Sequence, residues 1–383
     1  MLFRSLQDGE FVARVEGDEF AVVLRESDRS VIARRAKRLL EAVAQPVELQ
    51  NGEARVDVSI GIVVLPEDAV SAQDASRNAD LALRKAKADG RSRAAFFDDE
   101  MKRIAITRRQ LAQRLRKAID NDELTVHFQP QVLGEGAGLF GVEALARWPD
   151  GLHGFIPPTE FVPVAESYGM IFDLGNWVLN EACRIGRQWL EAGIDVPHIS
   201  VNVSAMQLWQ PDFVQTVDAA LRRYNLPASK LCIEVTESLF VDHEETRVLD
   251  VLTRLRDLGV LLSLDDFGSG YSSLGYLNKL PLRQIKIDRG FVAGVHENEN
   301  KQKILRGIVA LIKGLGLQVV AEGAELREEV SFLHELECDA VQGYFYGRPV
   351  SALQIPVEIA RIKDARAAEV KRKADIAYIR RAG

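Results

Sequence analysis

The sequence predicts an α/β protein whose larger part is a (β/α)8 barrel, because short apolar runs alternate with segments of helical length and period. The helical pattern is clear at residues 246–258 and 301–315. Several apolar runs carry a polar residue at or near their end: 141–143, 199–202, 232–234, 285–288, 319–322 and 340–342. So many strand–helix units in one chain predict a parallel sheet that closes into a barrel.

One apolar run, at residues 261–264, ends in two adjacent acids, Asp265 and Asp266, and a loop with two glycines follows. Adjacent side chains on a strand point to opposite faces, so both acids can serve one site only where the strand is already ending. Two buried anions without a cation would cost several kcal/mol each. Either both acids face water or a cation lies beside them.

The strand ends of such a barrel converge on one mouth, and this favours the cation. The polar residues that join the acid pair there are Glu143, Asn202, Glu234, Lys286, Glu322 and Gln342. They offer oxygen ligands without thiolate or imidazole, which suits Mg²⁺ or Mn²⁺. Two such ions about 3.5–4 Å apart would support in-line attack of water on phosphorus. For Lys286 an internal ion pair with Asp288 is the structural alternative.

Composition describes an ordinary globular protein of 383 residues, with 47% hydrophobic and 27% charged residues. The net charge of −7 argues against a nucleic-acid polymer as a partner but not against small phosphate ligands. No apolar run approaches the roughly 18 residues of a membrane span, so no membrane contact is expected within this chain. Three cysteines without metal-ligand spacing predict buried thiols and a cytoplasmic location, although a full-length protein could be membrane-anchored upstream.

The chain divides into four predicted segments. Residues 1–97 form a small α/β module that begins on a hairpin around the turn 16–19, residues 98–120 a connecting helix, residues 121–353 the barrel, and residues 354–383 a helical tail. Six histidines lie off the polar strand ends and are expected in core or surface roles.

The small module resembles the GGDEF family of diguanylate cyclases. The resemblance lies in Arg-Val-Glu-Gly-Asp-Glu-Phe at 14–20, Val-Ser-Ile-Gly at 58–61 and Ala-Asp-Leu-Ala-Leu at 79–83. Glu16 stands where the family has its first signature glycine, and the family's first strand and helix, with a metal-binding Asp and phosphate contacts, are missing. The resemblance therefore implies an N-terminally truncated, degenerate domain that is inactive or regulatory, with Asp18 and Glu19 as polar turn residues.

Residues 108–353 resemble the EAL family of cyclic di-GMP phosphodiesterases, through many motifs in order. They are Gln129-Pro130, Glu143-Ala144-Leu145-Ala146-Arg147, Asn202-Val203-Ser204, Glu234-Val235-Thr236-Glu237, Asp265-Asp266-Phe267-Gly268, Lys286-Ile287-Asp288, Ala321-Glu322-Gly323 and Gln342-Gly343-Tyr344. The family resemblance implies hydrolysis of cyclic di-GMP to linear pGpG in bacterial signalling, with two Mg²⁺ or Mn²⁺ ions, in a homodimer. The open alternatives are a receptor that binds cyclic di-GMP with little turnover and a module that docks partners.

The resemblance also assigns roles to residues. A first metal would be held by Glu143, Asn202, Glu234 and Asp265, and a second by Asp265, Asp266 and Glu322. Lys286 would hydrogen-bond the attacking water, Glu322 is a candidate general base, and Glu237 would hold the loop after Asp266. Substrate contacts would come from Gln129, Leu145, Arg147, Asp266 and Gln342.

Overall fold

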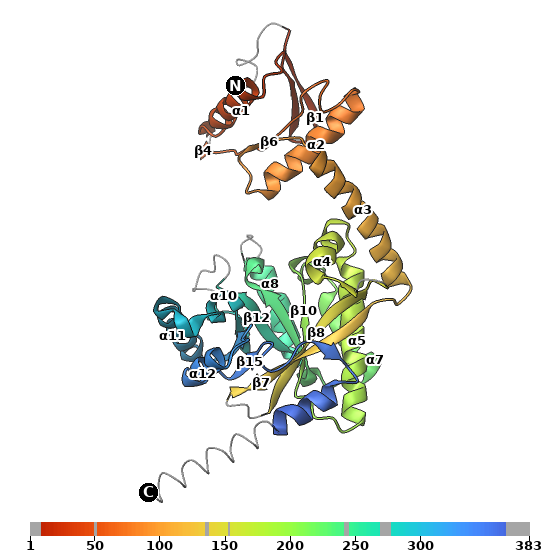
Figure 1. Ribbon diagram of the computed structural model, residues 1–383, viewed down its shortest axis with the longest axis vertical. Coiled ribbons are helices and arrows are strands. Elements are labelled where there is room, and N and C mark those ends of the chain that lie inside the picture. Colours follow the sequence, from red (N-terminus) through yellow and green to blue (C-terminus); the bar gives the residue numbers. More distant parts are fainter. Residues whose placement is uncertain are drawn as a thin grey trace, which may run out of the picture. The chain divides into compact units, whose positions relative to one another are not determined.

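The computed structural model describes residues 9–49, 52–134, 138–151, 154–240, 245–268 and 277–364. The chain forms two compact units, an N-terminal unit (Met1–Leu111) and a barrel unit (Ala112–Gly383). Helix α3 (Asp99–Asp120) carries the chain from one to the other, in the segment predicted as a connecting helix (Figure 1).

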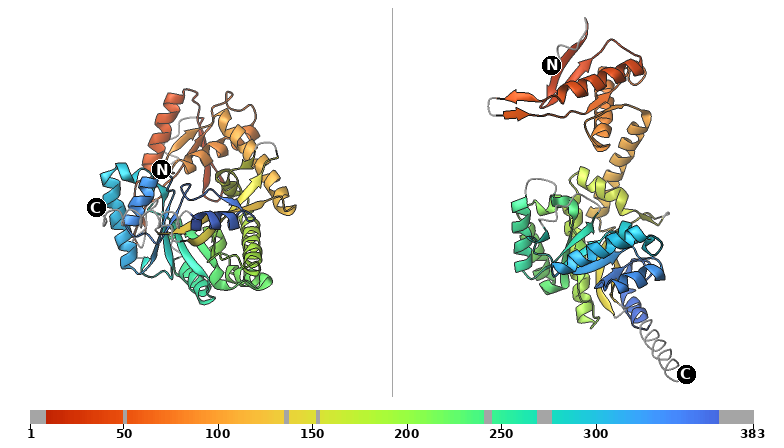
Figure 2. Two further views of the ribbon diagram at one scale, coloured as in Figure 1. Left: turned by 60° about the horizontal axis from the view of Figure 1, so that its bottom comes forward. Right: turned by 90° about the vertical axis from the view of Figure 1, so that its left-hand side faces the viewer.

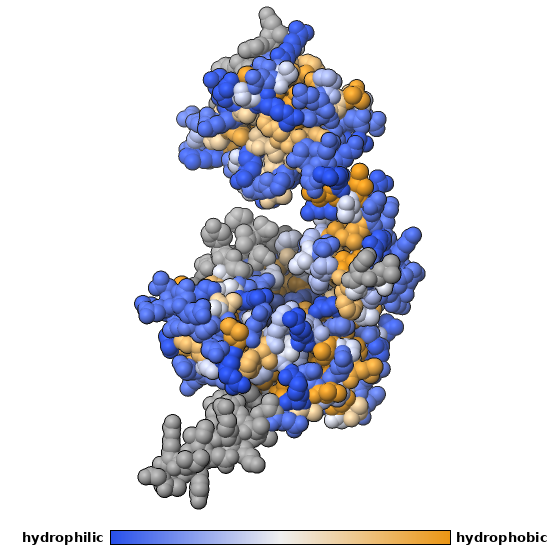
Figure 3. All heavy atoms as spheres, in the orientation of Figure 1, coloured by the Kyte–Doolittle hydropathy of each residue, from blue (hydrophilic) through white to orange (hydrophobic). Residues whose placement is uncertain are grey.

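The N-terminal unit is a small α/β assembly of paired strands and two helices. Strands β1 (Phe11–Glu16) and β2 (Glu19–Val23) form the predicted hairpin, β3 (Val47–Leu49) pairs with β4 (Gly52–Ala54), and β5 (Ile60–Ile62) pairs in parallel with β6 (Ala94–Phe96). Helices α1 (Arg29–Val43) and α2 (Ala72–Ala88) complete it. Apolar residues lie on its surface (Figure 3). Phe11, Val15 and Phe20 of the hairpin are each more than half exposed.

Eight strands close the barrel, in the order β7, β8, β10, β11, β12, β13, β14, β15 and back to β7. Their bounds are β7 (Thr125–Leu133), β8 (Leu139–Pro149), β10 (Ile199–Asn202), β11 (Leu231–Thr236), β12 (Leu261–Phe267), β13 (Gln284–Ile287), β14 (Gln318–Glu322) and β15 (Ala340–Gln342). The short strands β9 (Phe155–Ile156) and β16 (Val350–Ser351) add to β8 and β7. The predicted barrel is confirmed.

One strand departs from the predicted all-parallel sheet. Strand β7 runs antiparallel to both neighbours, β8 and β15, whereas the other barrel strands pair in parallel. The cause is the connection, because the chain between Leu133 and Leu139 is too short for the crossover helix that parallel neighbours require. The first two strands therefore form a hairpin.

Helices lie outside the strands, as Figure 2 shows from two sides. They are α4 (Pro158–Ser167), α5 (Ile171–Glu191), α6 (Ala205–Leu208), α7 (Phe213–Tyr224), α8 (Glu245–Asp257), α10 (Arg289–Val292), α11 (Glu299–Gly314) and α12 (Arg327–Glu335), with 3-10 turns η3 (Ala228–Lys230), η4 (Glu237–Phe240) and η5 (Val295–Glu297). The barrel strands are buried on both faces, as expected of a sheet covered by helices. Among the described helices, none combines the length and apolar character that crossing a membrane requires.

The three cysteines, Cys183, Cys232 and Cys338, are free and buried, as predicted. His198 is also buried and lies immediately before β10. Its ring is edge-on to that of Phe140, with the two ring centroids 5.2 Å apart. A Cβ on Gly141 would approach His198 Nε2 to 2.6 Å, so a glycine is needed where the ring packs on β8. Burial lowers the pKa of His198 to about 4.

This burial predicts an acid-sensitive step in stability. Below the unfolded-state pKa of about 6.5, His198 binds a proton in the unfolded chain but stays neutral in the folded chain. The free energy of unfolding therefore falls as the pH drops from 6.5 towards 4. The wild-type chain should lose about 2 kcal/mol more of its unfolding free energy between pH 7 and pH 5 than His198→Gln. Urea denaturation at both pH values measures this, and equal losses in the two proteins would contradict the assignment.

Candidate metal centre in the barrel mouth

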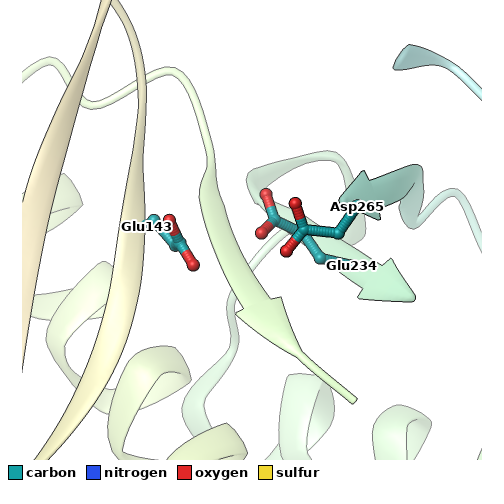
Figure 4. Close-up of side chains that lie close together, drawn as sticks. All are labelled: Glu143, Glu234 and Asp265. Carbon is teal, nitrogen blue, oxygen red and sulfur yellow. The ribbon is translucent and has the colours of Figure 1, made fainter. Parts of the chain in front are cut away.

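Five strands bring charged side chains to one end of the barrel. Glu143 comes from β8, Glu234 from β11, Asp265 from β12, Lys286 from β13 and Glu322 from β14. Figure 4 shows the carboxylate of Glu143 pointing toward those of Glu234 and Asp265. Because the parallel strands end at the same edge, residues far apart in sequence meet in the mouth, as the sequence analysis predicts.

Lys286 lies at the centre of these acids and is only 1% exposed. Its Nζ is 2.7 Å from Glu234 Oε2, 2.7 Å from Glu322 Oε1, 3.1 Å from Asp265 Oδ1 and 3.4 Å from Glu143 Oε2. Burial alone would lower the pKa of Lys286, but the four carboxylates outweigh it and raise this pKa well above its usual value. Asp288, the partner in the structural alternative, instead accepts a hydrogen bond from Gly290 N at 2.8 Å and caps α10.

One ammonium does not balance four carboxylates, of which Glu143, Glu234 and Asp265 are buried and Glu322 is half-buried. Burial, together with the neighbouring acids, raises the pKa of Glu234 to about 8 and raises those of Asp265 and Glu322 as well. The pKa of Glu143 moves the other way: burial opposes ionisation there, but Lys286 and two amide donors outweigh it. Oxygens under this mutual repulsion gain most from a divalent cation.

The acids form two groups that could each hold a metal ion. Glu143, Glu234 and Asp265 make one, Asp265, Asp266 and Glu322 the other, and within each group the ligand atoms lie within 4.8 Å of one another. Asp265 belongs to both groups. Oxygen Oε1 of Glu234 is buried without a hydrogen-bond partner, which leaves a lone pair available to an ion. The donor set therefore fits two hard divalent cations.

A collar of amides surrounds Glu143. Asn202 Nδ2 donates to Glu143 Oε1 at 2.6 Å, and Gln342 Nε2 donates to Glu143 Oε2 at 2.5 Å and to Gln129 Oε1 at 3.3 Å. Gln131, which the sequence analysis does not single out, donates to Gln342 Oε1 at 2.9 Å. The signal for Gln131 is its place two residues beyond Gln129, on the same face of β7.

The backbone at Asp266 explains how two adjacent acids serve one site. Asp266 has a φ of +53°, and the pairing of β12 with β13 shifts register between Leu264 and Phe267. This left-handed residue breaks the strand alternation that would turn neighbouring side chains apart. Burial, then the charge of Asp265, raises the pKa of Asp266.

Glu237 holds the chain immediately after this break. The Gly268 amide donates to Glu237 Oε2 at 2.7 Å, and Glu237 is 3% exposed. The rest of the loop that Glu237 is predicted to hold, residues 269–276, falls outside the described residues.

Three of the five predicted substrate-binding residues lie on β7 and β8, namely Gln129, Leu145 and Arg147, and the other two, Asp266 and Gln342, lie on β12 and β15. Arg147 and Leu145 are half-buried, and Gln129 is buried. Arg147 Nη1 donates to Ala146 O at 2.9 Å, and among the described residues no carboxylate lies within ion-pair distance of its guanidinium. Burial lowers the pKa of Arg147. Neither acidic group includes a histidine.

Lys286 provides a stability test of the cluster. Lys286→Met should destabilise the metal-free protein by about 3–5 kcal/mol, because it leaves three buried carboxylates and the half-buried Glu322 without their common cation. Added Mn²⁺ should restore much of that loss by binding the folded state. Urea denaturation with EDTA and with Mn²⁺ measures both effects. Lys313→Met, which removes a surface ion pair with Glu337, is the matched control and should lower the free energy of unfolding by less than about 1 kcal/mol. If both variants lost the same small amount of stability, the central role of Lys286 would be contradicted.

Comparison with known proteins agrees with this architecture. Residues 112–349 match the family described as EAL domain, and residues 1–93 match the family described as diguanylate cyclase, GGDEF domain. The chain is 40% identical over 349 residues to the bifunctional diguanylate cyclase/cyclic di-GMP phosphodiesterase MucR of Pseudomonas aeruginosa, covering 91% of this chain and 51% of MucR. It is 36% identical over 345 residues to the cyclic di-GMP phosphodiesterase NbdA of the same species, covering 90% of this chain and 44% of NbdA.

A solved structure described as the PaMucR phosphodiesterase in complex with c-di-GMP is 43% identical in sequence and superposes with a TM-score of 0.62. The superposition covers 64% of this chain and 99% of the chain in the solved structure. The chain spans about half the length of the curated relatives it matches. Both resemblances drawn from the sequence are confirmed: the chain belongs to the EAL-domain family, with a GGDEF-family unit ahead of the barrel.

Proposed function

We propose that the barrel is a phosphodiesterase that opens cyclic di-GMP to linear pGpG, using two Mg²⁺ or Mn²⁺ ions. The observation that carries this proposal is the sharing of Asp265 between two groups of carboxylates in one buried mouth. The names of the relatives MucR and NbdA, which both include cyclic di-GMP phosphodiesterase, support the substrate. The cyclic di-GMP complex of the similar P. aeruginosa barrel supports it as well.

The metal-holding residues follow from the two groups. Glu143, Asn202, Glu234 and Asp265 would hold one ion, and Asp265, Asp266 and Glu322 the other. When bound, the ions supply the positive charge that activates water and offsets charge on the phosphate oxygens. Lys286 is proposed to hydrogen-bond the attacking water, and Glu322 is proposed to accept the proton of that water. The contacts of Lys286 with all four carboxylates support a role for its ammonium at this site.

The substrate-holding residues lie on the adjoining strands. Arg147 has no acidic partner within the described residues, so its planar guanidinium is available to a phosphate in a two-bonded contact. Leu145 offers apolar contact to a base, and Asp266 lies at the edge of the cluster. Gln129 and Gln342 would meet the ligand from the collar around Glu143, where they also fix that carboxylate.

Two other functions use the same surface. A receptor would bind cyclic di-GMP with little turnover, and a docking module would bind partners without it. The complete set of predicted oxygen ligands favours the enzyme, because a receptor has no need to keep four repelling carboxylates close together.

The N-terminal unit is proposed to make no cyclic di-GMP and to act, if at all, in regulation. Glu16 occupies the position of the first signature glycine, and Asp18 lies in an exposed turn. Among the described residues, both acidic groups able to hold a metal lie in the barrel unit. We further propose a homodimer formed through the barrel and a location in the cytoplasm, where guanine nucleotides are available.

The activity assay is hydrolysis of cyclic di-GMP by the purified chain. Product should form with Mg²⁺ or Mn²⁺, cease with EDTA, and form slowly with Ca²⁺, which is larger and less exacting in geometry. Glu143→Ala and Asp265→Ala should each lower the rate more than about 100-fold, beyond the usual loss for a residue outside the ligand set.

The exposed Glu335→Ala on α12 is the matched control and should keep the wild-type rate. Full activity in EDTA would refute the metal mechanism. Tight binding of cyclic di-GMP without hydrolysis would favour the receptor, and cyclic di-GMP formed from GTP would contradict the silent N-terminal unit.

Glu237 yields a further prediction about the second group. Glu237→Ala removes the acceptor for Gly268 N, so Asp266 should lose its position and Mn²⁺ should bind there about 10-fold more weakly, with most turnover lost. Binding of cyclic di-GMP through Arg147 and Leu145 should persist. Glu237→Gln keeps the shape of the side chain and one acceptor oxygen, so its Mn²⁺ affinity and turnover should lie between those of the wild type and Glu237→Ala. Activity measured at increasing Mn²⁺ concentration tests both expectations. If Glu237→Ala kept the wild-type Mn²⁺ dependence and rate, the chain around Asp266 and Gly268 would hold its position without Glu237.

A further inference from the structure

Glu329 of helix α12 is a buried carboxylate outside the motifs that mark the site, and it is only 3% exposed. Its Oε1 accepts a hydrogen bond from Gly294 N at 2.8 Å. Its Oε2 accepts from Glu325 N at 2.8 Å and from Leu326 N at 3.0 Å. All three donors are backbone amides, so the side chain fixes main chain rather than another side chain.

These amides belong to two different segments that continue neighbouring barrel strands. Gly294 follows α10, which begins directly after β13 and Asp288. Glu325 and Leu326 follow β14, which ends at Glu322. Glu329 therefore joins the extensions of the strands that carry Lys286 and Glu322, whose charged atoms are 2.7 Å apart.

Helix capping accounts for only one of the three bonds. Leu326 is the N-cap residue of α12, and Glu329 accepts its amide, as a third helical residue commonly does. The Glu325 amide lies outside the helix, and Gly294 is 35 residues away in sequence. A cap needs neither of these bonds, and both restrain the site side of the barrel.

Other contacts between the two segments are weaker or passive. Arg289 pairs with Glu325 at 2.9 Å, but both side chains are largely exposed, and such pairs stabilise little. Gly323 has a φ of +71°, and a Cβ there would approach Arg289 Cγ to 2.3 Å, so the segments are packed closely just beyond Glu322. Close packing alone, without hydrogen bonds between the two segments, would not prevent Glu322 from shifting.

We infer that Glu329 is a positioning residue for the acidic cluster, which holds the extensions of β13 and β14 together so that Lys286 and Glu322 stay aligned with Asp265 and Asp266. This inference rests on the proposed function, because its expected consequence is a change in the Mn²⁺ affinity of the acidic group that contains Glu322. Glu329 itself belongs to neither of the two acidic groups.

The test compares Glu329→Ala and Glu329→Gln with Glu328→Ala, its exposed neighbour on the same helix. Calorimetric titration with Mn²⁺ should show one of the two sites weakened about 10-fold in Glu329→Ala, with the other site nearly unchanged. Glu329→Gln keeps one acceptor oxygen, so its loss should be smaller. Amide hydrogen exchange at Gly294, Glu325 and Leu326 should speed up in the order wild type, Gln, Ala.

Glu328→Ala should match the wild type in both measurements. Equal Mn²⁺ affinity and exchange in Glu329→Ala and Glu328→Ala would overturn the inference, and if the Ala variant does not fold, the same comparison with Glu329→Gln decides. A wild-type chain that binds no Mn²⁺ would refute the proposed function and this inference with it. Normal Mn²⁺ binding by the Glu329 variants alone would refute only the inference.

Discussion

The barrel mouth depends on one buried ammonium among four carboxylates. Lys286 contacts Glu143, Glu234, Asp265 and Glu322, and each of these comes from a different strand. A single positive charge holds the acids in place in the metal-free protein but leaves an excess of negative charge. Burial, and after it the charges of Glu143 and Asp265, raises the pKa of Glu234. Such a site is folded yet incompletely neutralised, and this combination suits the reversible binding of divalent ions.

The antiparallel first strand gives this cluster its amide collar. Because β7 returns directly into β8, Gln129 pairs with Glu143 and Gln131 pairs with Gln342 across the neighbouring strands. The chain of amides from Gln131 through Gln342 ends on the Glu143 carboxylate. Burial opposes ionisation of Glu143, but Lys286 and then the amides of Gln342 and Asn202 outweigh it, so the pKa of Glu143 is lowered. Strand β7 acts on Glu143 indirectly, because its two glutamines bind Gln342.

The sequence was sufficient for the barrel and for the convergence of its charged strand ends. Apolar runs ending in Glu143, Glu234 or Lys286 report locally which side chains face inward, and closure then brings them together. It was insufficient for β7, whose direction depends on the length of a connection, and for the left-handed Asp266, whose conformation no residue type signals. Gln131 was missed because its partner Gln342 lies far away in sequence, and the bond between Glu329 and Gly294 was missed for the same reason. Non-local contacts leave no periodic trace.

Strand ends position the acids, but the segments that follow them need separate restraint. Glu237 accepts the amide of Gly268, 31 residues away, beyond the end of β12. Glu329 accepts that of Gly294, 35 residues away, beyond the end of β13. In both cases a buried carboxylate binds backbone amides, which are present whatever side chain the loop carries. The loops can therefore vary in sequence while the acids keep their geometry. Precision at the cluster thus comes from a rigid sheet together with carboxylates that never meet the metal.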